Sequence, residues 1–123
     1  MPESVLIVDD SQFMRTLLKN ILLPHGYVVV AEAADGIEAI NMCRKHKPDV
    51  ILLDIVMPNL NGIEALKVIK SEFPEIKVIM CTALEQEAMV KEAIRHGADG
   101  YVVKPFKAKR VLEELERVLH YPI

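Results

Sequence analysis

The sequence predicts an α/β fold, in which a (βα)5 chain forms one doubly wound, five-stranded parallel sheet with helices on both faces. Five short runs rich in Val, Ile and Leu recur at near-regular spacing, which is typical of buried strands. Apolar residues at helical spacing lie between these runs. The chain has 123 residues, of which 51% are apolar, so one domain can bury its own core. We therefore expect a single domain over residues 1–123.

The predicted strands are the compact apolar runs. In chain order they are residues 5–8, 28–31, 50–53, 76–80 and 101–103. Runs of this kind indicate burial on both faces, which is the situation of a parallel sheet whose crossover helices pack on either side.

Each predicted strand is followed by a helical pattern. The apolar face is clear in residues 14–22, 63–69 and 111–119, and weaker in residues 37–46 and 86–96. Gly26 and Gly97 lie where a left-handed helix cap is expected, and Pro48 and Pro74 follow two other helices. Because parallel crossovers are right-handed, alternating elements of this kind place helices on both faces of one sheet.

Polar residues follow four of the five predicted strands. They are Asp9 and Asp10 after the first, Asp54 after the third, Thr82 after the fourth and Lys104 after the fifth. Ligands of open α/β sheets bind beyond the carboxyl ends of the strands, where the strand order reverses. The second strand leads only to Ala33 and Ala34, so we expect it at one edge, in the order 2-1-3-4-5.

The residue types at these strand ends suit phosphoryl transfer. Three carboxylates at one site repel each other unless a cation is present, and oxygen ligands suit Mg2+. The Lys104 ammonium can pair with Asp54 or with a phosphoryl group, and Thr82 offers a hydroxyl donor. Asp54 can then attack phosphorus in line while positive charge neutralises the transferred group.

Several segments together resemble the receiver domains of response regulators, which have the flavodoxin-like fold. The matching segments are residues 5–10, residues 54–58 with Asn61-Gly62, Thr82-Ala83, residues 97–99 and residues 104–106. They occur in the family's order and cover essentially the whole chain. The resemblance implies a single receiver domain with the strand order given above.

The resemblance also implies a role for each site residue. Asp54 would be the phosphoacceptor, and Thr82 and Lys104 would bind the phosphoryl oxygens. Mg2+ would be held by Asp9, Asp10, Asp54 and the main-chain carbonyl of Val56. Thr82 and Tyr101 match the two switch positions, and the Lys104-Pro105 bond matches one that is cis in the family.

The same resemblance implies a signalling switch rather than a metabolic enzyme. A histidine kinase would supply the phosphoryl group, and the surface of the fourth helix, fifth strand and fifth helix would bind an effector such as a flagellar motor switch. Residues 13–15 and the whole stretch 81–106 look most like the stand-alone chemotaxis members, which are monomers. Residues 121–123 follow the last helix closely, which also favours a stand-alone protein.

Two other uses of a receiver domain stay open. One is a phosphorelay intermediate, and the other is the receiver half of a DNA-binding response regulator. Individual residues also have structural alternatives: Asp9-Asp10 or Thr82 could cap a helix, and Tyr101 could be a packing residue. Val56 and Leu84 stand where some members have polar side chains, so we expect slow self-dephosphorylation.

Composition excludes several other classes. The 18 acidic and 15 basic residues give a net charge of −3, which removes a general attraction to nucleic acid. The start of the chain lacks the basic segment of a secretory signal, and the longest stretch without charged residues, 20–31, is too short to span a membrane. Cys43 and Cys81 fit reduced interior thiols. We expect a cytoplasmic protein without membrane insertion.

Overall fold

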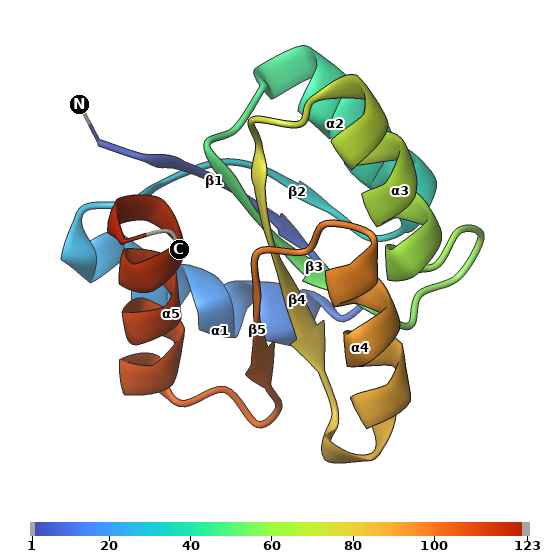
Figure 1. The fold of residues 1–123 in the computed structure, drawn as a ribbon. Helices are drawn as coiled ribbons and strands as arrows, with labels where there is room; N and C mark the ends of the chain where they lie inside the picture. The colour runs from blue at the N-terminus through green and yellow to red at the C-terminus, as the bar shows by residue number, and fades with distance from the viewer. Residues whose placement is uncertain (1, 122–123) are drawn as a thin grey trace.

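The sheet of the computed structural model has five parallel strands in the order β2-β1-β3-β4-β5 (Figure 1). The structure describes residues 2–121 apart from the Leu84 side chain, so that side chain and the end of the chain lie outside the described residues. The strands are β1 (Ser4–Val8), β2 (Val28–Ala33), β3 (Val50–Asp54), β4 (Lys77–Thr82) and β5 (Gly100–Val103). The predicted fold class and strand order are thus confirmed.

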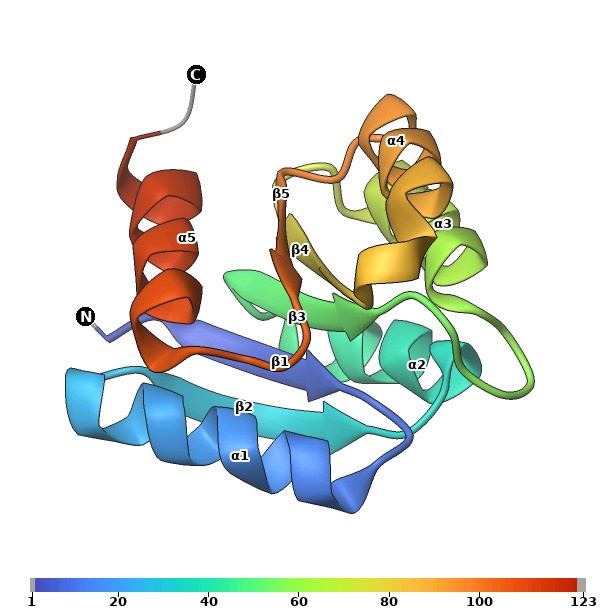
Figure 2. The same ribbon diagram turned by 90° about the horizontal axis from the view of Figure 1, so that it is seen from below.

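Helices cover both faces of the sheet. They are α1 (Gln12–Leu22), α2 (Gly36–His46), α3 (Gly62–Glu72), α4 (Glu87–Arg95) and α5 (Ala108–His120), with short 3-10 turns η1 (Leu23–His25) and η2 (Leu84–Gln86). Figure 2 shows α1 and α5 on one side of the sheet and α2, α3 and α4 on the other. Within the described part of the chain, no helix combines the length and apolar character that a membrane crossing needs.

The core therefore consists of two hydrophobic layers separated by the sheet. Leu6 and Leu53 belong to the layer under α2, α3 and α4, whereas Ile7 and Leu52 belong to the layer under α1 and α5. Neighbouring strand residues point to opposite faces of the sheet, and here helices bury both faces. This is why the strands appear in the sequence as continuous apolar runs.

Helix ends follow the local sequence. Ser11 caps α1, because its side chain accepts a hydrogen bond from the backbone N–H of Met14. Asp9 and Asp10 are therefore not the cap of this helix. Gly26 has φ 86° and Gly97 has φ 101°, as predicted for left-handed caps.

All five strands differ from their predicted bounds by one or two residues at one end or both. The fourth strand begins at Lys77 rather than Ile76 and ends at Thr82 rather than Met80. The N–H of Ile76 bonds to Phe73 O at 3.1 Å and closes the turn after α3, while the N–H of Lys77 bonds to Asp49 O. Ile76 is buried. Its apolar side chain is therefore explained by packing against the core and does not indicate strand pairing.

Candidate functional site

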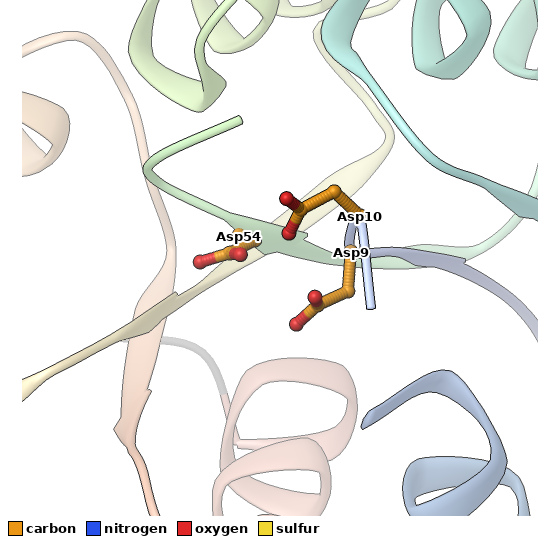
Figure 3. A group of neighbouring side chains, drawn as sticks. All are labelled: Asp9, Asp10 and Asp54. Atoms are coloured by element: carbon orange, nitrogen blue, oxygen red, sulfur yellow. The ribbon is translucent and has the colours of Figure 1, made fainter. Parts of the chain in front are cut away.

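Three carboxylates meet at the carboxyl ends of two neighbouring strands. Asp9 and Asp10 follow β1, and Asp54 ends β3, which pairs with β1 through Val8 and Leu53. One oxygen from each carboxylate lies within 4.8 Å of the others. Figure 3 shows this gathering of side chains. Asp9 and Asp54 are buried and Asp10 is exposed, so the cluster has a dry base and an open rim.

Lys104 brings a positive charge to the buried part of this cluster. Its Nζ lies 3.1 Å from Oδ2 of Asp9 and 3.2 Å from Oδ2 of Asp54. The backbone N–H of Lys104 donates to Thr82 O at 2.7 Å, which fixes the end of β5 beside the end of β4. The Lys104-Pro105 peptide bond is cis, as the resemblance implies.

The cluster carries more negative charge than the lysine neutralises. Burial and the neighbouring Asp9 carboxylate raise the pKa of Asp54 to about 6, although Lys104 acts in the opposite direction. Burial by itself would lower the pKa of Lys104, but the Asp54 and Asp9 carboxylates outweigh burial and raise it. Lys104 therefore stays charged, but its single positive charge does not neutralise the three carboxylates, so the site favours binding of a further cation.

Asp9 indicates where such a cation would bind. Its Oδ1 accepts a hydrogen bond from the backbone N–H of Ser11 at 2.9 Å. Its Oδ2 is buried and lies near Lys104 Nζ, but forms no hydrogen bond of acceptable geometry. An unsatisfied buried carboxylate oxygen beside two further carboxylates is a donor set that fits a hard divalent ion such as Mg2+. The Val56 side chain is 53% exposed on the adjoining loop, and its carbonyl as a ligand stays a prediction.

A glycine allows the loop after β3 to fold back against the backbone of Asp54. The N–H of Gly62 donates to Ile55 O at 2.7 Å. A Cβ on Gly62 would collide with the backbone carbonyl oxygen of Asp54. Asn61 caps α3 directly before it, with its side chain accepting from the N–H of Glu64. The Asn61-Gly62 pair thus sets the start of α3 against the site.

Arg15 supports the other half of the cluster, a role that the sequence analysis did not predict. Its Nη1 donates to the backbone oxygen of Asp9 at 2.6 Å, and its Nε donates to Oε1 of Glu32 at 3.0 Å. Lys19 forms a second ion pair with Glu32 at 2.8 Å. Glu32 is an isolated charge in the otherwise apolar β2, and that isolation is the signal that could have revealed this support.

Thr82 lies at the end of β4 and is 2% exposed. Its Oγ1 lies 3.1 Å from both Ala83 O and Oε1 of Gln86, to which the hydroxyl can donate. Gln86 Oε1 also accepts from the N–H of Ala83 at 2.9 Å. Ala83, not Thr82, is the N-cap of η2. Thr82 is therefore bonded to the loop that leads into α4.

Thr82 and Tyr101 both line a cavity of about 160 Å³. It is lined by Thr82, Ala83, Glu87, Val90, Tyr101 and Val103. Tyr101 is 41% exposed, whereas Val102 is buried on the other face of β5. Tyr101 and Val103 thus share one side of the strand, and there is space beside the Tyr101 ring.

Comparisons with known proteins give consistent matches. Residues 5–116 match the family described as response regulator receiver domain. The chemotaxis protein CheY of Listeria monocytogenes is 51% identical over 113 residues, which is 92% of this chain and 95% of that protein. CheY of Thermotoga maritima is 48% identical over 118 residues, which is 96% of this chain and 98% of that protein. A chain in the crystal structure of a CheX-CheY-BeF3-Mg2+ complex from Borrelia burgdorferi has a TM-score of 0.92 at 38% identity, covering 96% of this chain and 90% of that chain.

Proposed function

The chain belongs to the response regulator receiver domain family, and from this premise we propose that it is a phosphorylation-activated switch of a two-component system in chemotaxis. In this proposal Asp54 accepts a phosphoryl group from a histidine kinase when Mg2+ is bound. The observation that carries the proposal is the meeting of three carboxylates with the Lys104 ammonium at one edge of the sheet. The chain then acts as a single receiver domain that catalyses its own phosphorylation.

In the proposed step, an Asp54 carboxylate oxygen attacks the phosphorus of a phosphohistidine in line with the phosphorus–nitrogen bond. A phosphorus–oxygen bond forms and the phosphorus–nitrogen bond breaks. The imidazole nitrogen keeps the electron pair and takes a proton from solvent, so an aspartyl phosphate and a neutral histidine result. Lys104, 3.2 Å from Asp54 Oδ2, favours the ionised carboxylate that attack requires and can then pair with a phosphoryl oxygen.

The metal would neutralise the phosphoryl oxygens that the Lys104 ammonium does not reach. The groups that would hold Mg2+ are Asp9, Asp10, Asp54 and the main-chain carbonyl of Val56. The unsatisfied Oδ2 of Asp9 supports this assignment, since coordination would satisfy an oxygen that hydrogen bonding leaves free.

The aspartyl phosphate is proposed to hydrolyse slowly. Val56, two residues after Asp54, offers an attacking water no acid or amide, and its side chain faces solvent. Leu84, two residues after Thr82 in the sequence, likewise has no acid or amide group that could assist an attacking water. A purified phosphoprotein that loses its phosphate within seconds without a phosphatase would contradict this part of the proposal.

The signal is proposed to leave through Thr82 and Tyr101. A phosphoryl group adds oxygens that need donors, and the Thr82 hydroxyl could exchange Gln86 for one of them. The cavity beside Tyr101 would then receive its ring. This movement would change the surface formed by α4, β5 and α5, where an effector such as a flagellar motor switch would bind. Basic residues border this surface, and they could steer an acidic partner segment: Lys104, Lys107, Lys109 and Arg110.

Gel filtration separates this proposal from the receiver half of a DNA-binding regulator. A monomer with and without beryllofluoride supports the chemotaxis role, whereas dimerisation on adding beryllofluoride favours the DNA-binding class. Transfer of the phosphoryl group from Asp54 to a second histidine protein would indicate a phosphorelay intermediate.

Labelling tests the central claim. Wild-type protein incubated with radiolabelled acetyl phosphate should incorporate label only when Mg2+ is present, and EDTA should prevent it. Asp54→Asn should abolish labelling. The matched control is Glu75→Gln at an exposed acid, which should label like the wild type. Full-stoichiometry labelling of Asp54→Asn would place the acceptor elsewhere.

A further inference from the structure

A buried carboxylate of α5 holds the backbone of the strand that carries Tyr101. Glu114 is 6% exposed, and its Oε2 accepts a hydrogen bond of 3.0 Å from the backbone N–H of Tyr101. Because β5 is an edge strand, Glu114 takes the position that a further strand would occupy. Figure 1 shows β5 between α4 and α5.

Arg117 fixes this carboxylate from the next turn of α5. Its Nε and Nη2 donate to the two oxygens of Glu114 at 3.0 and 2.9 Å, and Nη2 also donates to Asp99 O at 2.8 Å. Burial would raise the pKa of Glu114, but the hydrogen bonds from Arg117 and from Tyr101 N–H outweigh burial and hold it below its usual range. The pair thus grips β5 on both sides of Gly100.

Gly100 is where this arrangement needs a residue without a side chain. A Cβ at this position would collide with the Glu114 carboxylate and would lie 2.8 Å from Arg117 Nη2. Only glycine lets the two charged groups reach the backbone of β5. We call Gly100, Glu114 and Arg117 the β5 clamp.

The strand is also fixed where it begins. The Asp99 carboxylate accepts the N–H of Val78 at 2.9 Å and pairs with Lys70 of α3 at 2.9 Å. The N–H of Asp99 donates to Val78 O at 2.8 Å. The backbone on the N-terminal side of Tyr101 is thus held by α3, β4 and α5, while its ring borders the cavity on the side of α4.

We infer that Glu114 is a positioning residue for the Tyr101 switch, because the β5 clamp holds the backbone of Tyr101 still while its side chain moves. This inference rests on the proposed function. A strand of four residues at the sheet edge could otherwise absorb the displacement of Thr82 by shifting as a whole. With the clamp in place, a change at Thr82 must appear as rotation of the ring.

The test uses beryllofluoride with Mg2+ as the phosphoryl mimic on the full chain labelled with fluorotyrosine. The Tyr101 signal is assigned with Tyr101→Phe. In the wild type, we expect the mimic to bind and the Tyr101 signal to shift. In Glu114→Ala, we expect binding of the mimic within about twofold of wild type, a Tyr101 shift reduced by half or more, and amide exchange at Tyr101 about tenfold faster for the lost hydrogen bond.

Further variants separate positioning from a general loss of packing. Glu114→Gln keeps an acceptor for the Tyr101 N–H and should restore most of the ring shift, whereas Gly100→Ala should reproduce Glu114→Ala by displacing the carboxylate. Glu113→Ala at the exposed neighbouring acid should behave like the wild type. If Glu114→Ala does not fold, Arg117→Met provides the same measurements.

The possible failures are distinguishable. A full Tyr101 shift in folded Glu114→Ala that binds the mimic overturns the positioning role alone. Failure of the wild type to bind the mimic overturns the proposed function, and the positioning role with it.

Discussion

The Nζ of Lys104 lies 3.2 Å from Oδ2 of Asp54, yet the pKa of Asp54 is still raised to about 6. Burial and the Asp9 carboxylate outweigh this single ammonium. The metal-free site is therefore electrostatically strained at neutral pH. Binding of a divalent cation would reduce this repulsion, and transfer of a phosphoryl group to Asp54 would alter it.

A pH-dependent stability follows for the metal-free protein. Below its ordinary pKa of 3.8, Asp54 is protonated in both the folded and the unfolded chain. Because its pKa is higher in the folded state, its contribution to the free energy of unfolding is largest at acid pH and is lost as the pH rises through about 6. The loss is at most about 3 kcal/mol, given a pKa of 3.8 in the unfolded chain and about 6 in the folded one.

Urea unfolding in EDTA measures this effect. Asp54→Asn should be more stable than the wild type at pH 8, and the gain should shrink as the pH approaches 4. Saturating Mg2+ should reduce the difference, since it favours the ionised carboxylate. Glu75→Gln serves as the control for loss of one acid. An equal gain at both pH values would show that Asp54 does not titrate as described.

The placement of the site could be predicted from the sequence because it depends on topology. The carboxyl ends of parallel strands lie along one edge of a sheet, so residues at positions 9, 54 and 104 come together once the strand order is known. That order was predicted from the polar residues that follow four of the strands, because the second strand leads only to Ala33 and Ala34 and was therefore expected at one edge. The turn at Ile76 was mistaken for strand because burial and strand pairing give the same apolar signal.

The groups that support the site could not be predicted in this way. The contact of Arg15 with Asp9 O, of Gln86 with Thr82 and of Glu114 with Tyr101 N–H each depends on how a long side chain is oriented by packing. An exposed and a buried glutamate look alike in a helical pattern: Glu113 and Glu114 are adjacent, but only the second contacts β5.

Asp10→Asn tests the metal assignment. Asp10 is exposed at the rim of the cluster, and its charge is one of the causes that raise the pKa of Asp54. Removal of this charge should weaken Mg2+ binding by about tenfold or more and slightly stabilise the metal-free fold. A Mg2+ titration followed by amide shifts gives the affinity. An affinity equal to that of the wild type would exclude Asp10 as a ligand.

Gly62→Ala tests whether the loop after β3 must approach Asp54 closely. The added Cβ would collide with the backbone oxygen of Asp54, so we expect a loss of about 1 to 3 kcal/mol in the free energy of unfolding together with weaker Mg2+ binding. Gly26→Ala is the control, because its φ of 86° makes alanine strained although nothing lies near the new Cβ. That variant should lose stability but keep its Mg2+ affinity.

The last prediction concerns where the phosphorylation signal appears. Thr82 bonds to Gln86 at the start of the segment that leads into α4, and the cavity beside Tyr101 links that segment to β5. A phosphoryl mimic that draws Thr82 away from Gln86 should therefore disturb α4 and β5 together, while α2, on the far side of α3, stays as it is. Beyond the residues adjoining Asp54, we expect amide shifts on adding beryllofluoride and Mg2+ to cluster in residues 82–96 and 99–111. Gln86→Ala removes the partner that Thr82 gives up, so the amide shifts between the free and beryllofluoride-bound protein should be smaller in this variant. Shifts confined to α1 and α2 would show that the signal leaves the site by another route.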